Sequence, residues 1–292
     1  MSAASVVELR GVSKVYRRKI ALRDCTLVIP SCRVVALVGS NGAGKSTMLR
    51  IMAGLTSPSS GEVSILGHPG ALDVASHLSR VGYLDQDRPL YRGFRVSEML
   101  RAAARSNEYW NEQLARDYLA QLGIGLEQRI RQLSGGQSAQ VALTLCLATE
   151  PELLILDEPA AALDPAARQD LLQLLMQQVS SGKVSVVLST HALDDVVAIC
   201  DYLVVVAHGR VVVSDDLEFI LQSHRLMRST TAQDHWPEGA VVIEDRRGMR
   251  DGMVLLRMEL PVTDARFELE EPTLDEIVLA YMRRATTGAV AP

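Results

Sequence analysis

The sequence lacks an excess of positive charge. Its 30 lysine and arginine residues stand against 35 aspartate and glutamate residues, which gives a net charge of −5 at pH 7. No overall basic field is therefore present to gather the phosphates of nucleic acids or of anionic lipids. We expect no nucleic-acid partner.

Paired cysteines are missing as well. Cys25, Cys32, Cys146 and Cys200 show no C-x-x-C spacing, and the last two lie in apolar stretches typical of thiols in a protein core. This usage is typical of a protein that stays in a reducing compartment.

A long uninterrupted apolar run is also missing. The apolar stretch 196–207 is interrupted by Asp201, and it is far shorter than the roughly 20 residues that a membrane-spanning helix needs. The first 11 residues do not contain the apolar core of a signal peptide. We therefore expect any contact with a membrane to go through a partner.

The apolar residues that are present, 48% of the 292 in the chain, are enough for a sizeable core. Short apolar runs rich in β-branched residues, separated by helical patterns, occupy 34–38, 153–156, 184–188 and 202–206. This alternation predicts buried parallel strands in an α/β sheet. The runs 204–206 and 211–213 lie close enough together to predict a hairpin.

Two segments differ in composition from this alternation. Residues 88–134 are rich in Arg, Ala, Glu and Leu and poor in strand formers, which predicts a helical subdomain over about 88–138. After Asp215 the chain alternates between charged, glycine-rich stretches and weaker apolar ones. We therefore expect a main domain over 1–215 and an appendage over 216–292.

The appendage contains one well-defined helical pattern. Thr273 and Glu276 have the spacing of a capping box, which predicts an amphipathic helix over about 273–284. Its apolar face carries Leu274, Ile277, Val278 and Tyr281. We expect this face to pack on the C-terminal segment of the same chain, with docking on a partner as the alternative.

A glycine-rich loop follows the first of the apolar strands. Residues 39–47 match G-x-x-x-x-G-K-[ST], between a strand and the helical pattern 46–55. The glycines permit backbone conformations that point successive N–H groups inward, and the helix N-terminus adds a positive dipole. The loop therefore predicts a phosphate cradle, with Lys45 as its point charge and Ser46 as a hydroxyl ligand for magnesium.

Two acids end the apolar strand 153–156. Asp157 and Glu158 would repel each other unless a cation or a donor lies beside them. Because side chains alternate in direction along a strand, Asp157 can orient a metal ion while Glu158 polarises an attacking water. A merely acidic strand end is the structural alternative.

Two further polar residues follow apolar strands. His191 comes after 184–188, which places it on the same carboxyl edge of the sheet as the cradle and the acids. Gln86 follows the segment 81–85 and can reach a metal ion or a water. Without that placement, a helix cap or surface role for His191 and a surface role for Gln86 would be the default.

A second potential anion site lies at Ser134-Gly135-Gly136-Gln137, which opens the helical pattern 138–147. Ser134 and Gln137 have capping-box spacing, so an ordinary capped helix start is one interpretation. Two glycines in the first turn also leave backbone N–H groups open to an anion. The chain would then have two phosphate sites.

With these motifs in this order, the sequence resembles the ABC ATPase family over roughly residues 6–215. The L-S-G-G-Q signature of that family is present here without substitution at 133–137. The resemblance implies a P-loop NTPase (RecA-like) core with an antiparallel β subdomain and an inserted α-helical signature subdomain. To this α/β core the chain adds a small C-terminal α+β appendage.

The resemblance also implies ATP and Mg²⁺ as cofactors, with Tyr16 stacking on the adenine. Catalytic roles fall to Lys45, Gln86, Glu158 and His191, and metal contacts to Ser46, Gln86 and Asp157. The remaining nucleotide contacts would be Gly39, Ser40, Asn41, Gly42, Ala43, Gly44, Thr47, Ser134, Gly135, Gly136 and Gln137.

In the family, the signature of one subunit closes over the ATP held by another, which would explain two half-sites in one chain. The resemblance thus implies a second ATPase protomer, identical or related, and a transmembrane permease subunit that Gln86 senses. The protein would be cytoplasmic and peripheral on the inner face of the cell membrane, with membrane contact only through the permease.

The sequence departs from the family pattern in two places. Ser138 and Ala139 stand where many relatives carry Arg, and the segment 160–164 lacks the usual serine. Neither change removes a catalytic group. Asp164 before Pro165 is suited to cap a helix, so its role is either structural or across a dimer.

The C-terminal string 270–279 is similar to the tails of ATPases that serve type-2 ABC exporters. We therefore expect an export ATPase. The alternatives are an importer ATPase, for whose usual β-barrel appendage the remaining residues are scarcely enough, and a non-transport ABC ATPase. The uninterrupted cassette and the negative net charge disfavour a non-transport role, and the intact Lys45, Glu158 and His191 disfavour a silent regulatory subunit.

Overall fold

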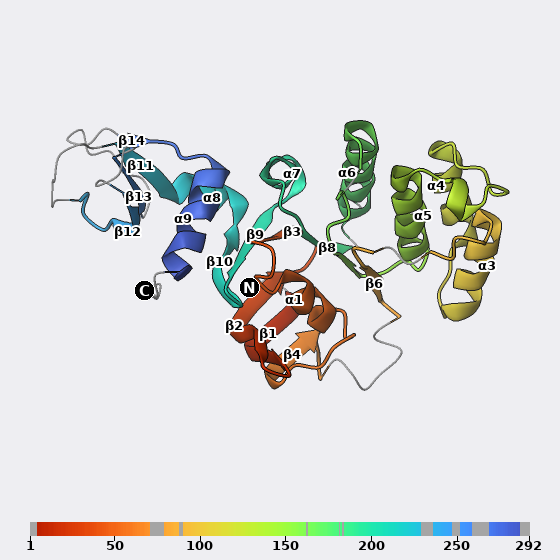
Figure 1. The fold of residues 1–292 in the computed structure, drawn as a ribbon, viewed down its shortest axis with the longest axis horizontal. Coiled ribbons are helices and arrows are strands. Elements are labelled where there is room, and N and C mark those ends of the chain that lie inside the picture. The colour runs from red at the N-terminus through yellow and green to blue at the C-terminus, as the bar shows by residue number, and fades with distance from the viewer. Residues whose placement is uncertain are drawn as a thin grey trace.

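The computed structural model describes residues 5–70, 79–87, 90–161, 163–180, 182, 184–228, 236–246, 252–258 and 269–286. A six-stranded sheet runs through its centre in the order β10-β9-β3-β8-β7-β6 (Figure 1). Its strands are β3 (Val34–Val38), β6 (Val81–Leu84), β7 (Leu153–Leu156), β8 (Ser185–Ser189), β9 (Tyr202–Ala207) and β10 (Arg210–Asp216).

The central sheet is parallel except for β10, which pairs with β9 as an antiparallel hairpin. All residues of β3, β7 and β8 are buried, as expected for strands covered on both faces. The predicted parallel strands and the predicted hairpin are confirmed, with β8 displaced by one residue.

Each face of the sheet has its own hydrophobic core. One core packs α1 (Lys45–Met52) and a second, antiparallel sheet against the central strands. That sheet has the order β2-β1-β4-β5, with β1 at Ser5–Tyr16, β2 at Lys19–Pro30, β4 at Ser60–Ile65 and β5 at His68–Pro69. The other core includes α6 (Pro165–Ser180) and α7 (Leu193–Ile199).

A group of helices extends one end of the molecule (Figure 1). It contains α3 (Val96–Ser106), α4 (Glu112–Gln121), the 3-10 turn η1 (Ile130–Gln132) and α5 (Gly135–Leu147), which share a core of their own. α5 also packs against β6 and α6, so the signature at its N-terminus is tied to the central sheet.

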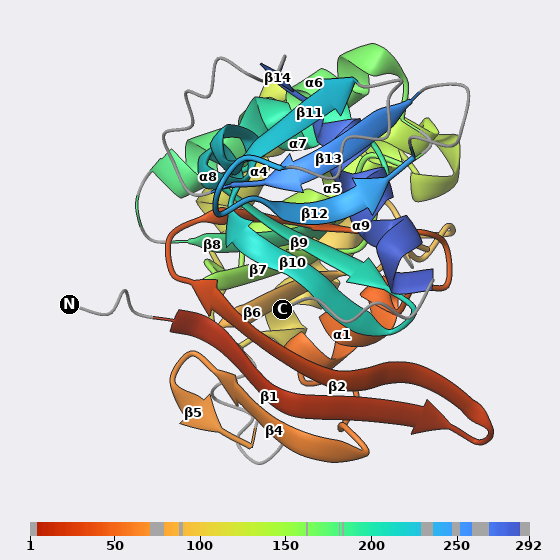
Figure 2. The same cartoon turned by 90° about the vertical axis from the view of Figure 1, so that its left-hand side faces the viewer.

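The C-terminal residues form a third sheet at the opposite end (Figures 1 and 2). Its order is β12-β13-β11-β14, from β11 (His224–Arg228), β12 (Val241–Asp245), β13 (Met253–Arg257) and β14 (Leu269–Glu270). Two helices flank this sheet, α8 (Leu217–Ser223) and α9 (Leu274–Thr286).

The amphipathic helix α9 is confirmed, and its capping box is formed. The Thr273 hydroxyl accepts a hydrogen bond from Glu276 N at 3.3 Å, and Glu276 Oε2 accepts one from Thr273 N at 2.8 Å. Its apolar side chains are buried within the chain, against β9 and β10 as well as β12. The prediction that this face packs on the C-terminal segment is therefore incomplete, because α9 also packs on the central sheet.

Within the described residues, none of the helices combines the length and the apolar content that crossing a membrane requires.

Candidate active site

The loop between β3 and α1 has the backbone of a phosphate cradle. Gly42 and Gly44 have φ angles of 79° and 113°, which side chains rarely allow. A Cβ on Gly44 would lie 2.7 Å from Ala21 O, and one on Gly39 would lie 2.2 Å from Val206 O. The loop is therefore held close to neighbouring strands, and no side chain of the described residues caps α1 at Gly44.

Lys45 lies inside this loop. Its residue is 6% exposed, and Nζ donates hydrogen bonds to Gly39 O at 2.8 Å and Ser40 O at 3.2 Å. Burial lowers the pKa of Lys45, while the negative charges of Glu158 and Asp157 oppose that shift. Backbone carbonyls thus hold the ammonium group at the loop, and the negative charges of the two carboxylates favour its charged form.

Asp157 and Glu158 are linked through a serine at the end of the neighbouring strand. Asp157 is 2% exposed, and its Oδ1 accepts a hydrogen bond from Ser189 Oγ at 2.6 Å. The same Ser189 Oγ accepts a hydrogen bond from Glu158 N at 2.8 Å. Because β7 and β8 pair in parallel, their carboxyl ends meet and one hydroxyl can fix both acids.

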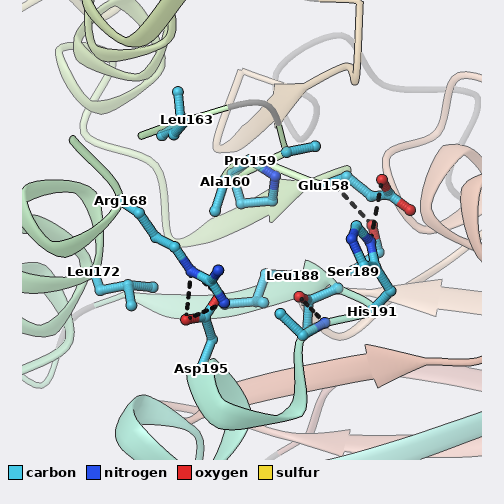
Figure 3. Close-up of a pocket in the computed structure, with 13 residues that line it drawn as sticks. Glu158, Pro159, Ala160, Leu163, Arg168, Leu172, Leu188, Ser189, His191 and Asp195 are labelled. Carbon is cyan, nitrogen blue, oxygen red and sulfur yellow. Dashed lines mark hydrogen bonds and ion pairs between the residues drawn. The ribbon is translucent and has the colours of Figure 1, made fainter. Parts of the chain in front are cut away.

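Glu158 faces His191 across the end of the sheet (Figure 3). His191 Nδ1 lies 3.6 Å from Glu158 Oε2, and the His191 side chain is 67% exposed. Glu158 has a φ angle of 47°, in the left-handed region that residues other than glycine seldom adopt. Such backbone strain is concentrated at functional sites.

These elements enclose one open cavity of about 600 Å³. It is lined by Tyr16, Lys19, Ala21, Asn41, Gly42, Gly44, Lys45, Ser46, Thr47, Gln86, Glu158 and His191. The structure thus brings Tyr16, most of the cradle, Gln86, Glu158 and His191 around a single space. Of the other predicted residues, Gly39, Ser40, Ala43 and the buried Asp157 are not among those that line it.

Tyr16 presents an aromatic surface to this cavity. Its residue is 43% exposed, and Lys14 Nζ lies 5.0 Å from its ring centroid. Lys14 is anchored by a 2.6 Å hydrogen bond to Ser57 O and is not among the residues that line the cavity. The ring therefore has both an electrostatic partner and an exposed surface beside the cradle.

The signature residues are not brought to this cavity. None of the described residues lining it comes from 134–137. Ser134 instead caps α5, where Ser134 Oγ accepts from Gln137 N and Gln137 Oε1 accepts from Ser134 N, both at 3.1 Å. Ser134 and Gly135 remain exposed. Within one chain, the signature and the cradle are thus separate sites.

Two residues on the wall of the cavity, Lys19 and Ala21, and the bridging Ser189 were not predicted from the sequence. Lys19 and Ala21 lie in β2, and no local motif connects that strand to the cradle. For Ser189 a signal was present, because this serine follows the apolar run 186–188, just as Asp157 follows the apolar run 153–156.

The fold and the site define a P-loop nucleoside triphosphatase, and comparison with known proteins gives its family. The family model described as ABC transporter matches residues 22–161. The chain is 31% identical to a solved structure of the ATP-binding subunit of an ABC transporter, with a TM-score of 0.66, covering 74% of this chain and 92% of that one. The chain belongs to the ABC transporter ATP-binding subunits.

Two curated relatives have opposite directions of transport. The chain is 34% identical over 212 residues to Nod factor export ATP-binding protein I of Sinorhizobium fredii, covering 71% of this chain and 62% of that protein. It is 37% identical over 217 residues to the sulfate/thiosulfate import ATP-binding protein CysA of Yersinia pestis, covering 70% and 59%. The matched part therefore spans less than two thirds of either relative.

A second solved structure is a dimeric ATP-binding cassette in a post-hydrolysis state, bound to ADP and phosphate. It is 25% identical to this chain with a TM-score of 0.65, and the match covers 72% of this chain and 98% of that one. The predicted P-loop fold is confirmed by these neighbours.

The residues present fit ATP and magnesium, which are the cofactors of this domain. A side chain at Gly39 or Gly44 would collide with the backbone of Val206 or Ala21, so these glycines let the loop lie close to the sheet, and the loop ends at the N-terminus of α1, where a phosphate would be favoured. The Ser46 hydroxyl and the Gln86 amide line the cavity and would supply oxygen ligands of the kind that magnesium prefers, and the buried Asp157 carboxylate would supply a third.

Proposed function

We propose that this chain is the ATP-hydrolysing motor of an ABC transporter whose membrane-spanning permease is a separate chain. The observation that carries the proposal is the cavity that joins Tyr16, the cradle, Gln86, Glu158 and His191. Its aromatic end suits a purine base, its glycine loop suits a triphosphate, and its acid and imidazole face the γ-phosphate end.

Each side chain has a task in hydrolysis. Lys45 would pair with the β- and γ-phosphates, and Ser46 and Asp157 would hold a magnesium ion, which would neutralise the negative charge that develops on the phosphates. Glu158 polarises the attacking water, because its carboxylate faces the open cavity while Asp157 remains below. His191, 3.6 Å from Glu158, contacts the transferred phosphoryl group, and Gln86 contacts the metal or the water.

A second copy completes the site. The signature of this chain lies outside its own cavity, and its exposed helix start at Ser134 and Gly135 has the N–H groups that an anion needs. We therefore assign a head-to-tail dimer in which each signature closes on the γ-phosphate held by the partner. The dimeric structure of a similar cassette supports this arrangement.

The permease would contact the segment that follows Gln86. Tyr91 and Phe94 in this segment are 66% and 38% exposed and stack on each other with ring centroids 5.1 Å apart. An exposed aromatic pair next to a cavity-lining residue suits a protein partner. We therefore propose that the chain works on the cytoplasmic face of the cell membrane, bound through the permease and without a nucleic-acid partner.

Export is the direction we propose. The first curated relatives are export ATPases, and the 270–279 string is similar to the tails of type-2 exporter ATPases. The import ATPase of comparable identity supports an importer as the second candidate. Reconstitution with the permease encoded beside the gene would decide, because transported substrate accumulates on opposite sides in the two cases.

Substitution of the assigned groups tests the motor itself. We expect Lys45→Ala and Glu158→Gln each to lower kcat for Mg-ATP about 100-fold or more, because general-base and electrostatic contributions have that size. Glu152→Gln is a matched control, since it neutralises an acid at the opposite end of β7. Hydrolysis that persists in both Lys45→Ala and Glu158→Gln would refute the assignment.

Co-purification tests the transporter role. Recovery of the chain with membranes that contain its permease is the expected result. Recovery only with ribosomes or DNA would contradict it.

A further inference from the structure

A second, smaller cavity of about 190 Å³ lies behind the candidate active site (Figure 3). Glu158 and His191 line both this cavity and the larger one, so they form the wall between them. The far side of the smaller cavity is formed by α6 and α7, which carry Arg168, Leu172 and Asp195. Arg168, Leu172 and Asp195 therefore line the smaller cavity but not the larger one.

Arg168 and Asp195 join these two helices through a two-pronged ion pair. Arg168 Nε donates to both carboxylate oxygens of Asp195, at 2.8 and 2.9 Å, and its terminal nitrogen lies 2.7 Å from Oδ1. The Asp195 side chain is 9% exposed and that of Arg168 is 34% exposed. A buried carboxylate with this geometry restricts both position and angle of its partner.

The two helices continue the segments that carry Glu158 and His191. α6 begins seven residues after Glu158, and α7 begins two residues after His191. The His191 loop is held on its strand side by Ser189, and within itself by a 3.0 Å hydrogen bond from Ala192 N to Thr190 Oγ1. On its helix side, the loop continues into α7, and the Arg168–Asp195 ion pair connects α7 to α6.

The space between Glu158, His191 and this ion pair is a cavity and not packed core. The two helices share a hydrophobic core through Leu171, Val196 and Ile199. At the cavity itself side-chain packing is incomplete, so the ion pair at its edge adds the contact that fixes the start of α7 against α6. Loss of the tie would let the start of α7 shift relative to α6. His191 would then move relative to Glu158, which it now faces at 3.6 Å.

We propose that Arg168 and Asp195 are positioning residues that hold His191 and Glu158 facing each other for hydrolysis. This inference rests on the proposed ATPase function. Neither residue lines the nucleotide cavity, so nucleotide affinity is not expected to depend on them. The pair acts on the reacting end of the site and not on the cradle.

The test compares kcat and KM for Mg-ATP in the full-length chain. The double variant Arg168→Met with Asp195→Leu removes both charges together, and such apolar replacements usually preserve folding. We expect its kcat to fall about 10- to 100-fold, as misplacement of about 1 Å does elsewhere, with KM changed less than about twofold. Arg168→Lys keeps the charge but loses the two-nitrogen geometry, so its kcat should fall measurably, although less than that of the double variant.

The matched control is the pair Arg80 and Glu152, which also joins two segments through two nitrogens but lies at the amino ends of β6 and β7. Arg80→Met with Glu152→Leu should leave kcat unchanged. Melting temperatures are measured for all variants. If both double variants lose stability but only the Arg168 and Asp195 variant loses kcat, the loss of kcat does not come from reduced stability.

Wild-type kcat in the Arg168 and Asp195 double variant, or a rise in KM alone, would overturn the proposal. If that double variant does not fold, unchanged kcat in Arg168→Lys would overturn it equally. A wild-type chain without ATPase activity, or an active Glu158→Gln variant, would instead count against the ATPase function itself.

Discussion

At the level of single side chains, the two acids at the end of β7 depend on one hydroxyl. Ser189 donates to Asp157 and accepts from the Glu158 backbone N–H. It thereby fixes the carboxylate of Asp157, which is proposed to hold magnesium, and the backbone of Glu158, which is proposed to polarise the attacking water. The residue has no exposed surface, so it acts only through these two neighbours.

Ser189→Ala should therefore lower kcat about tenfold, since a lost hydrogen bond to a charged group is worth about 1.5–3 kcal/mol. Ser185→Ala is the matched control, because Ser185 is buried at the other end of β8 and accepts from Cys32 N at 2.9 Å. Both variants should lose stability, but only Ser189→Ala should lose kcat. Equal kcat in the two variants would contradict this account.

The sequence predicted the kinds of residue around the cavity but not their connections. Asp157, Glu158 and His191 end apolar strands, and parallel strands bring their carboxyl ends to one edge. Ser189 also ends such a strand, but its hydrogen bond to Asp157 depends on the register of β7 against β8, which the sequence does not show. Arg168 and Asp195 show no local pattern at all, because their contact depends on how α6 packs beside α7.

At the scale of helices, Asp164 lies in the segment that follows Glu158 and contacts the start of α6. Asp164 Oδ1 accepts hydrogen bonds from Ala166 N at 3.1 Å and Ala167 N at 3.0 Å, as an N-cap does. This geometry supports the capping role, and Asp164 is also exposed. Exposure is also what a contact across a dimer would require.

Two substitutions of Asp164 separate these roles. Asp164→Ala should cost about 0.5–2 kcal/mol in unfolding free energy, because the cap is lost. Asp164→Asn keeps a capping oxygen and should retain that stability. Urea titration measures both. A loss of ATPase activity in Asp164→Asn at unchanged stability would show that its charge is needed beyond the cap.

In the C-terminal sheet, His224 is buried between α8 and α9. It is 2% exposed, and its ring bonds to Tyr281 OH at 3.0 Å and Ile220 O at 2.7 Å. Burial lowers the pKa of His224 from 6.5 to about 4, with smaller contributions in the same direction from Arg257 and Arg225. The folded appendage therefore holds His224 neutral at neutral pH.

The unfolded chain binds a proton on this histidine below pH 6.5, whereas the folded chain does not until near pH 4. Stability should therefore fall as the pH drops through this window, by about 3 kcal/mol from this group. Trp236 fluorescence in a Trp110→Phe background reports on the appendage during urea unfolding. The same pH dependence in His224→Asn would contradict the assignment.

Elements with strong local periodicity were predicted well. The strands β3, β7 and β9 and the helix α9 agree with the sequence pattern to within two residues at each end. The strands of the third sheet were not located, although an α+β appendage was expected, because β11 pairs with both β13 and β14 across long stretches of chain. The packing of α9 on β9 was missed for the same reason, since such contacts carry no local signal.

At the scale of the whole molecule, the separation of the two proposed phosphate sites is the observation that favours a dimer. The cradle opens into the nucleotide cavity, whereas the signature start at Ser134 lies outside it. In the proposed dimer, ATP held between two copies would use both sites, and its hydrolysis would let the copies separate, which a permease could convert into movement.

The mass of the Glu158→Gln variant in solution tests this arrangement most directly, because slow hydrolysis would keep ATP in place. Light scattering should show a dimer with Mg-ATP and a monomer without it. Adding Ser134→Asp should abolish the dimer, because aspartate keeps the helix cap but repels the γ-phosphate. A Glu158→Gln chain that stays monomeric in saturating Mg-ATP, or a dimer indifferent to Ser134→Asp, would contradict the account.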